Sequence, residues 1–224
     1  MLILIPAYNE AERIAAVIAD VLVAALAMPV LVVDDGSRDD TAAVAEAAGA
    51  TVLRQTPNQG KGAALRAGMR WALEHGHDGV ITLDADGQHD PAQIMAFTMR
   101  HALTSADLII GARNFAEMPP VRRLANTLGR RSFSWAVGEY IEDNQSGYRL
   151  LSRRMIEAVL DSREQGFEFE VEMIVACLQR GYVLDWVPIR TIYAGEGSHI
   201  NPVKHMANWV RIVLKTRRAM RRNA

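Results

Sequence analysis

Short apolar runs alternate with helical stretches through the first half of the chain, and this alternation restricts the folds it can adopt. Helical patterns cover residues 10–26, 39–48 and 62–74, and Asp90-Pro91 predicts the start of another helix. The apolar runs between them cover residues 2–5, 30–33, 52–53, 79–83 and 108–110. Short apolar strands separated by helices are typical of a mainly parallel sheet with helices on both faces. We therefore expect an α/β fold.

The second half of the chain is less regular. Residues 119–141 mix arginines with large apolar side chains, and residues 143–149 are polar. Residues 167–180 predict a helix, residues 183–187 a strand and residues 194–202 a loop. Because 224 residues fit one domain, we expect a single α/β domain over residues 1–202. A basic amphipathic helix is expected over residues 203–224.

Three polar clusters each follow a predicted strand. The first polar cluster covers residues 7–10, the second residues 34–37 and the third residues 84–88; they read Ala-Tyr-Asn-Glu, Asp-Asp-Gly-Ser and Asp-Ala-Asp-Gly-Gln. In parallel sheets the ligand site lies outside the carboxyl ends of the strands. The sequence therefore predicts that the three clusters meet at one edge of the sheet and form a ligand site there.

Asp84 and Asp86, two residues apart at the end of a strand, suit a hard divalent cation. Mg²⁺ takes oxygen ligands, usually one or two carboxylates together with substrate phosphates and water. Such a cation neutralises charge on a diphosphate leaving group. Two aspartates at this spacing also occur in solvated loops and helix caps, and their place beside the other two clusters favours the metal site.

The other polar residues leave alternatives open. In the second polar cluster, Asp35 could contact a ribose or base, whereas Asp39 could merely cap a helix. Glu10 could contact the nucleotide or face a helix dipole. Residues 58–62, Asn-Gln-Gly-Lys-Gly, resemble a phosphate-binding glycine loop at a helix start, or form a flexible turn with an exposed Lys61.

In combination, these motifs resemble the inverting glycosyltransferases of the GT-A fold, in their family 2 branch. The resemblance runs from residue 2 to about residue 200 and includes Gly111-Ala112-Arg113 and Ser146-Gly147-Tyr148-Arg149. It looks closest to the dolichyl-phosphate mannosyltransferases and polyprenyl-phosphate glycosyltransferases, through residues 169–175 and 187–189. The resemblance implies a Rossmann-like sheet, a nucleotide-sugar donor (UDP- or GDP-linked) and a lipid-linked acceptor such as a polyprenyl phosphate.

The same resemblance implies roles for individual residues. Arg113 and Arg149 would neutralise phosphate charge, as planar guanidinium groups do well. Asp84 and Asp86 would bind the donor phosphates through Mg²⁺ or Mn²⁺, with Gln88 nearby and Lys61 in the glycine loop. The nucleoside pocket would be lined by Pro6, Tyr8, Glu10 and Asp35.

A general base is needed only if the acceptor is a hydroxyl. The related enzymes that use hydroxyl acceptors carry Asp at the position of Glu170, so Glu170 is either the base or part of a polar helix start. Asp143 is a weaker candidate, and Glu172 could orient the site. A polyprenyl phosphate is already anionic and can dispense with a base.

The sequence departs from the resembling mannosyltransferases after residue 189, where they carry a basic loop. Arg190, His199 and Lys204 are the candidates for a cation that closes over the donor. His89 and His199 are otherwise expected to be surface histidines.

The distribution of charge predicts what the C-terminal segment contacts. From Val203 onward there are seven Lys or Arg and no acid, and because the whole chain carries −1, the preceding residues carry about −8. At helical spacing, one face of the tail carries Met206, Trp209, Val210 and Val213, and the other is basic. This pattern suits an anionic membrane surface or a helix docked on the domain. The acidic body argues against nucleic acid.

The remaining features concern the compartment. The single cysteine, Cys177, lies in an apolar helical stretch and is expected to be buried. One cysteine excludes an internal disulfide and fits a reducing compartment. There is no charged leader and no apolar run of the ~20 residues needed to span a bilayer. We expect a cytoplasmic protein, at most peripheral on the inner face of the cell membrane.

The same residues argue against two other functions. A sugar-phosphate nucleotidyltransferase would open with a glycine- and arginine-rich loop after the first strand, and here the first polar cluster stands instead. A non-catalytic nucleotide-binding or membrane adaptor protein would have no reason to retain the Asp84–Asp86 pair together with Arg113 and Arg149.

Overall fold

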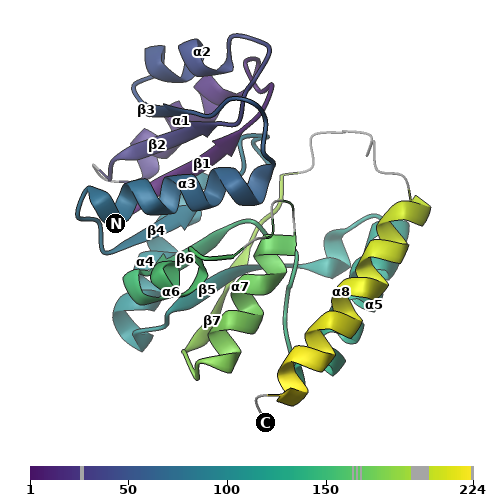
Figure 1. Cartoon of the computed structure of the whole chain (residues 1–224). Coiled ribbons are helices and arrows are strands. Elements are labelled where there is room, and N and C mark those ends of the chain that lie inside the picture. The colour runs from purple at the N-terminus through teal and green to yellow at the C-terminus, as the bar shows by residue number, and fades with distance from the viewer. Residues whose placement is uncertain (26–27, 163, 165, 167, 193–201, 223–224) are drawn as a thin grey trace.

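The computed structural model describes residues 1–25, 28–162, 164, 166, 168–192 and 202–222, and at positions 122, 202–208 and 222 it describes only the backbone. Strands and helices alternate along most of the chain (Figure 1). The strands are β1 Leu2–Ala7, β2 Val30–Asp34, β3 Thr51–Arg54, β4 Gly79–Thr82, β5 Leu108–Arg113, β6 Arg149–Ser152 and β7 Leu184–Ile189. The helices are α1 Ile14–Ala24, α2 Thr41–Ala47, α3 Lys61–Glu74, α4 Ile94–Thr104, α5 Pro120–Val137, α6 Arg153–Val159, α7 Glu168–Gln179 and α8 Pro202–Arg222, with short 3₁₀ turns η1 Pro91–Gln93 and η2 Phe115–Glu117.

The strands form one mixed sheet in the order β3-β2-β1-β4-β6-β5-β7. The pairs β1–β2, β1–β4, β2–β3 and β5–β7 are parallel, and β6 runs antiparallel to both of its neighbours. The predicted α/β fold with a mainly parallel sheet is therefore confirmed. Strand β6 and the following helix α6 were not predicted, because the four residues of β6 begin with an arginine in a stretch that reads as polar.

The antiparallel direction of β6 shapes the edge where ligands are expected. Thr82 near the end of β4 pairs with Arg149 at the start of β6. The residues just before β6 therefore lie beside the residues just after β4, and Thr82 Oγ1 donates a 2.7 Å hydrogen bond to the Gly147 carbonyl. As a result, residues 143–149 are brought next to the third polar cluster.

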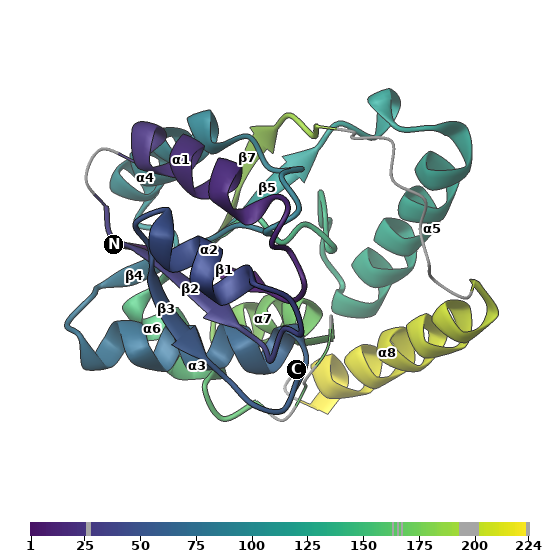
Figure 2. The same ribbon diagram turned by 90° about the horizontal axis from the view of Figure 1, so that it is seen from above.

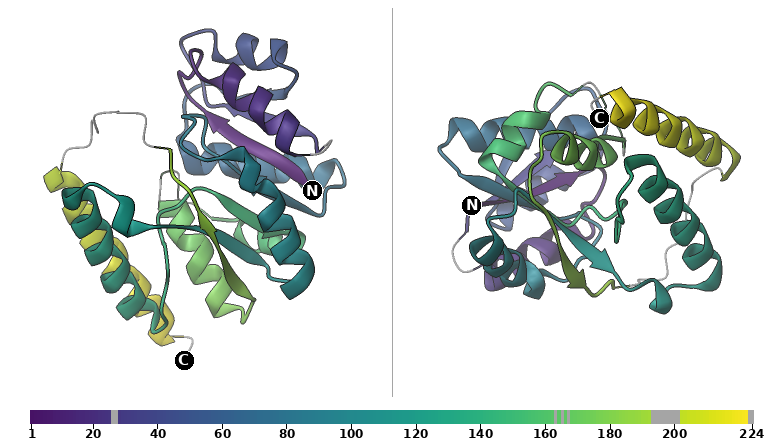
Figure 3. Two further views of the ribbon diagram at one scale, coloured as in Figure 1. Left: turned by 180° about the vertical axis from the view of Figure 1, so that it is seen from behind. Right: turned by 90° about the horizontal axis from the view of Figure 1, so that it is seen from below.

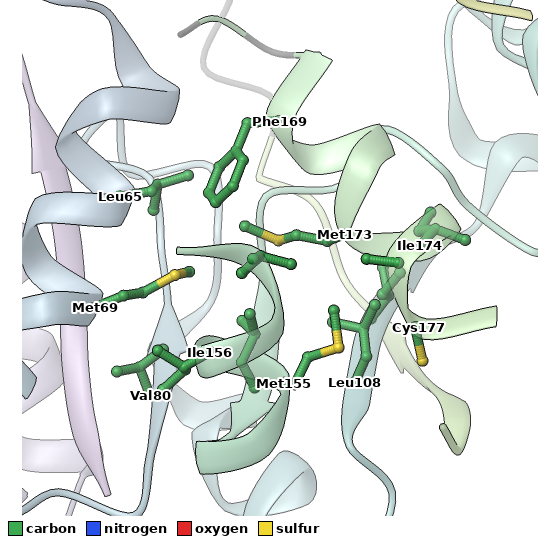
Figure 4. Packing of buried hydrophobic residues seen from close by; sticks show 14 of the residues in the cluster. Leu65, Met69, Val80, Leu108, Met155, Ile156, Phe169, Met173, Ile174 and Cys177 are labelled. Carbon is green, nitrogen blue, oxygen red and sulfur yellow. The ribbon is translucent and has the colours of Figure 1, made fainter. Parts of the chain in front are cut away.

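Alternation along the strands divides the core between the two faces of the sheet. Leu2 and Leu4 of β1 pack with α3, α6 and α7, whereas Ile3 and Ile5 pack with α1 and α4. This is the arrangement expected when both faces of a sheet are covered. Figure 4 shows part of the first of these two clusters, where side chains from α3, α6 and α7 meet over β4 and β5.

Cys177 is one of these core side chains, and it is fully buried, as predicted (Figure 4). Burial raises the pKa of its thiol to about 12, so it remains protonated at neutral pH. The residue acts as an apolar packing group.

The first helix starts later than its pattern predicts. Residues 11–13 form a turn and α1 begins at Ile14, not at Glu10. The backbone amides of Glu10 and Ala11 instead donate to Thr41 Oγ1 and Asp39 Oδ2. The Asn9 amide donates a 2.9 Å hydrogen bond to Ser37 Oγ, so the first and second polar clusters are tied together.

Helices α5 and α8 lie side by side, and α8 also contacts α7 (Figures 1, 2 and 3). Trp209 Nε1 donates a 3.0 Å hydrogen bond to Ser132 Oγ, and Arg217 donates to the Trp135 carbonyl. Val213 is buried, whereas Val210, predicted to lie on the same apolar face, is half exposed. Within the described residues, the buried side chains of α8 are Val213 and Thr216.

None of the helices within the described residues is long and apolar enough to cross a membrane. The predicted basic helix over residues 203–224 corresponds to α8, Pro202–Arg222. The division of the chain at residue 202 into a domain and a separate helix stays a prediction.

Candidate active site

A cavity of about 350 Å³ opens at the edge formed by the carboxyl ends of β1, β2 and β4. All three polar clusters contribute to it, so their predicted convergence is confirmed. Tyr8 is 41% exposed at this edge and offers an aromatic face. The lining residues are Pro6, Ala7, Tyr8, Glu10, Asp35, Asn58, Gly60, Lys61, Ala64, Asp84, Ala85 and Asp86.

Seven of the predicted site residues line this cavity: Pro6, Tyr8, Glu10, Asp35, Lys61, Asp84 and Asp86. Four others, Gln88, Arg113, Glu170 and Arg149, lie around it without lining it. Glu172, the residue suggested to orient the site, instead lines a separate groove of about 470 Å³ between α6, α7 and α8.

The second polar cluster shapes the wall of the cavity through backbone contacts. Asp35 is buried, and its two carboxylate oxygens accept hydrogen bonds from the amides of Gln59 and Gly60 at 2.9 and 2.7 Å. Asp35 therefore holds the glycine loop in front of α3. Its predicted contact with the nucleoside stays a prediction.

Gly36 lets this loop approach closely. It adopts a φ of +74°, and a Cβ atom at this position would lie 2.8 Å from the Asn58 amide nitrogen. Both the backbone conformation and the contact exclude a larger residue without movement of the loop. The cluster and the glycine loop thus form one rigid wall.

Lys61, the first residue of α3, extends between two carboxylates. Its Nζ lies 2.6 Å from Asp84 Oδ1 and 2.9 Å from Glu170 Oε1. Its side chain is 19% exposed, so the alternative of an exposed lysine on a flexible turn is wrong. Sequence spacing gave no sign of the pairing with Glu170, which lies more than 100 positions further along the chain on α7.

These ion pairs determine the charge states of Lys61 and Asp84. Burial acts to lower the pKa of Lys61, but the Asp84 and Glu170 carboxylates outweigh it and raise that pKa well above its ordinary value. Burial likewise acts to raise the pKa of Asp84, but Lys61 outweighs it and brings that pKa to about 2. Both groups are therefore charged at neutral pH.

Asp86 lies in the third polar cluster, and His89 directly follows it. Asp86 Oδ1 accepts a hydrogen bond from the Gln88 amide, and burial together with the charge of Asp84 raises the pKa of Asp86. His89 is buried, so the expectation of a surface histidine is wrong. Burial lowers its pKa, and its Nδ1 accepts a 3.1 Å hydrogen bond from the Asp84 amide. His89 thus supports the loop as a neutral imidazole.

Gly147 forms the opposite side of the site. A Cβ atom at this position would lie 2.8 and 2.9 Å from the two carboxylate oxygens of Asp84 and 2.9 Å from Lys61 Nζ. Only a glycine leaves these side chains where they are. The need for it depends on the antiparallel placement of β6, which the sequence did not predict.

Arg149 is fully buried, and its guanidinium contacts other buried parts of the protein. Its guanidinium donates to the backbone carbonyls of Ser146 and Glu170, and a longer contact reaches Asn144. It therefore ties the loop before β6 to the start of α7. The phosphate contact predicted for Arg149 stays a prediction.

Arg113 makes a bidentate ion pair with Asp143, with distances of 2.6 Å for Nε–Oδ2 and 2.9 Å for Nη2–Oδ1. Asp143 is fully buried and engaged in this pair, which does not favour it as a general base. Arg113 also lies 6.0 Å from the centre of the Phe115 ring.

Arg130 contacts the same Phe115 ring, and it was not predicted as a site residue. Its guanidinium carbon is 5.0 Å from the centre of the Phe115 ring and 5.7 Å from that of Tyr140. Its Nε is buried without a hydrogen-bond acceptor, and within the described residues it has no carboxylate partner. The signal in the sequence is only an arginine on an amphipathic helix, which many helices carry.

The segment after β7 crosses the third polar cluster. The Ile192 amide donates to the Gln88 carbonyl at 3.0 Å, and the Arg190 amide donates to Gln93 Oε1. Arg190 itself is exposed. His199 and the side chain of Lys204 lie outside the described residues, so the choice of a closing cation stays open to experiment.

Asp84 and Asp86 fit a divalent cation that is shared with a substrate. Among the described residues there is no group of three or more His, Cys, Asp or Glu placed to hold a metal by itself. Two carboxylates with the remaining ligands supplied by phosphates and water are a usual magnesium site. The donor set therefore fits Mg²⁺ or Mn²⁺ bound together with a diphosphate.

Comparison with known proteins identifies the family. Residues 2–162 match the profile of Glycosyl transferase family 2. An undecaprenyl-phosphate mannosyltransferase of Micrococcus luteus is 34% identical over 204 residues, covering 84% of this chain and 82% of that protein. A polyprenol monophosphomannose synthase of Mycolicibacterium smegmatis is 32% identical over 203 residues, covering 84% and 76%.

A solved structure supports the fold. Glucosyl-3-phosphoglycerate synthase from Mycobacterium tuberculosis, crystallised with Mn²⁺, uridine diphosphate and phosphoglyceric acid, matches with a TM-score of 0.70 at 21% identity, over 96% of this chain and 75% of that one. At this identity the likeness concerns the fold alone. The family profile covers more than half of the chain, and the protein is therefore a glycosyltransferase that belongs to glycosyl transferase family 2.

Proposed function

We propose that this enzyme transfers a hexose, with inversion, from a UDP- or GDP-linked donor to a polyprenyl phosphate. The observation that carries the donor half is the cavity in which Tyr8, Lys61, Asp84 and Asp86 come together. The names of the two similar proteins from Micrococcus luteus and Mycolicibacterium smegmatis support the acceptor half.

The donor fits the cavity by its chemistry. Tyr8 offers a partly exposed ring for the nucleoside, and the glycine loop with Lys61 at the start of α3 suits a diphosphate. A divalent cation at Asp84 and Asp86 would neutralise charge on the diphosphate as it leaves. The acceptor oxygen then bonds to the anomeric carbon as the bond from that carbon to the diphosphate breaks.

The contacts of Glu170 favour a phosphate acceptor. Its carboxylate is 2.9 Å from Lys61 Nζ, and the residue is only 4% exposed. A carboxylate engaged with a lysine is poorly placed to take a proton from a hydroxyl. A phosphate acceptor is anionic already and does not need that step, so the competing proposal of a glycan or lipid hydroxyl with Glu170 as base is less favoured.

Arg130 is our candidate for the acceptor side of the site. Two aromatic rings hold its guanidinium, and its buried Nε has a hydrogen bond left to donate. A phosphate is the ligand that such a group binds best. Phe115 also lies near Arg113. The charge of Arg113 contributes to lowering the pKa of Asp84, so this group of residues is linked to the donor site.

The direct test is transfer of labelled sugar from a panel of UDP- and GDP-sugars to undecaprenyl phosphate, with Mn²⁺ or with EDTA. We expect a glycolipid that forms only with metal. The Glu170→Gln variant should keep most of this activity. Donor hydrolysis without any glycolipid, or loss of transfer to a hydroxyl acceptor in Glu170→Gln, would instead support the hydroxyl alternative.

Replacing Gly147 with alanine should lower transfer about 10²-fold, because the new methyl group displaces Asp84 and Lys61 by a fraction of an ångström to an ångström. The control is Ser146→Ala, since the Ser146 hydroxyl is buried without a partner and its removal breaks no contact. Steady-state transfer rates and thermal melting of both variants provide the measurement. Equal rates for the two variants would show that Gly147 does not shape the site.

We also propose that α5 binds a membrane surface beside the acceptor. Val121, Leu124, Leu128 and Trp135 are between 55% and 82% exposed and, at 100° per residue, share one stripe of the helix. Arg123 and Arg131 are exposed on the same helix. Apolar side chains flanked by arginine suit an anionic interface.

Vesicle co-sedimentation tests this surface. The double variant Leu124→Ser/Leu128→Ser should bind vesicles of anionic lipid about tenfold less than the wild type, because each leucine removes apolar area from water on binding. The matched control is Val23→Ser/Leu103→Ser, since these side chains are 83% and 80% exposed on α1 and α4. An equal loss in both double variants would argue against α5 as the membrane face.

A further inference from the structure

Lys61 competes for the carboxylate that a metal would need. Its Nζ lies 2.6 Å from Asp84 Oδ1. Asp84 is one of the two aspartates that fit a divalent cation. An ammonium group and a dication on the same carboxylate repel each other. While Lys61 stays on Asp84, this repulsion therefore lowers the affinity of the carboxylate for a metal.

A second anchor keeps Lys61 in the site if it leaves Asp84. Glu170 Oε1 is 2.9 Å from Lys61 Nζ. The Arg149 guanidinium donates a hydrogen bond to the Glu170 backbone carbonyl and so fixes the position of Glu170. Gly147 closes a further side, since a Cβ there would lie 2.9 Å from Nζ. The ammonium group is thus confined to the space between Asp84, Glu170 and Gly147.

The open direction from that space leads to the diphosphate. Lys61 and Asn58 line the cavity next to Asp84 and Asp86, and α3 begins at Lys61. The N-terminus of a helix favours an anion. A nucleoside diphosphate bound there offers Lys61 a new anionic partner. It also offers a metal the oxygen ligands that two carboxylates leave unfilled.

We propose that Lys61 makes metal binding depend on the nucleotide: it opposes a divalent cation at Asp84 until a nucleoside diphosphate draws its ammonium group away. This inference rests on the proposed donor site and adds to it an order of assembly. A cation would bind weakly to the protein alone and tightly together with the nucleotide, and the coupling acts equally in both directions.

The test is Mn²⁺ binding measured by calorimetry or by electron paramagnetic resonance of free Mn²⁺, with and without UDP or GDP. Lys61→Met removes the charge and keeps the length of the side chain. It should bind Mn²⁺ without nucleotide about tenfold more tightly than the wild type, and the gain from added nucleotide should shrink by a similar factor. Lys61→Arg keeps the charge and should behave like the wild type.

The control is Arg70→Met, which removes one positive charge from an exposed position on the same helix. It should leave Mn²⁺ affinity near the wild-type value. If Lys61→Met binds Mn²⁺ without nucleotide no more tightly than the wild type, Lys61 orients Asp84 for the metal and the inference is wrong. Lys61→Gln provides a second neutral variant if Lys61→Met does not fold.

The two levels of the proposal fail differently. A wild type that binds Mn²⁺ neither with UDP nor with GDP would contradict the donor site itself. A wild type that binds Mn²⁺ only with nucleotide, and a Lys61→Met variant that does the same, would leave the donor site standing and overturn the role of Lys61.

Discussion

Replacing Asp86 with asparagine is expected to lower sugar transfer about 10³-fold while the protein stays folded. The substitution removes one of two carboxylates that fit the cation and, with it, the charge that would compensate the leaving diphosphate. Stability should not fall, because burial and the nearby charge of Asp84 make the ionised form of Asp86 unfavourable. Transfer rates and urea denaturation measure the two effects.

The control for this variant is Asp20→Asn, an equal change at an exposed position on α1. It should leave both transfer and stability unchanged. If Asp86→Asn keeps more than a tenth of the wild-type transfer rate, the diphosphate does not bind at Asp86.

Replacing Arg149 with methionine is expected to lower the free energy of unfolding by about 3–5 kcal/mol. The buried guanidinium donates to the carbonyls of Ser146 and Glu170, and both would lose their donor without gaining water. The change should also lower transfer, because the same contacts place Gly147 and Glu170 around Lys61. Chemical denaturation followed by circular dichroism measures the loss of stability.

Arg153→Met is the matched control for this stability effect. Arg153 is four residues further along the chain, and its ion pair with the exposed Asp78 is at the surface. Surface pairs contribute about 0–1 kcal/mol. Equal stabilities of the Arg149 and Arg153 variants would mean that Arg149 does not hold the two segments together.

The sheet and the convergence of the three polar clusters were predictable because they follow from local patterns. Strand-like runs such as residues 30–33 are wholly apolar, and each is followed by a helical stretch, which together predict parallel strands with their carboxyl ends at one edge. Asp35, Asp84 and Asp86 could be placed on that edge by counting from the strand ends alone.

The contacts around Lys61 were not predictable, because they join segments that are distant in the sequence. Glu170 reaches Lys61 only through the packing of α7 against α3, and Gly147 reaches Asp84 only because β6 is antiparallel. Neither the direction of a four-residue strand nor the rotation of one helix against another is encoded in local periodicity. The sequence showed the residue types in the site, and tertiary packing decided their partners.

His89 and Val210 illustrate the same limit for burial. His89 directly follows a polar cluster that reads as solvated, yet it is buried in contact with Tyr148 and the Asp84 amide. Val210 belongs to the apolar face of α8 by its spacing, but it is half exposed, whereas Val213 and Thr216 are buried. In both cases the neighbouring element decided which side chain is covered.

The central claim is that Asp84 and Asp86 bind a nucleoside diphosphate through a divalent cation. The most direct measurement is calorimetric titration of UDP and of GDP into the wild type and Asp86→Asn, each with Mn²⁺ and with EDTA. We predict binding of one nucleotide to the wild type with Mn²⁺, with much weaker binding in EDTA or in the variant. If that nucleotide binds both proteins equally well with Mn²⁺ and with EDTA, the claim is contradicted and the diphosphate binds away from these two aspartates.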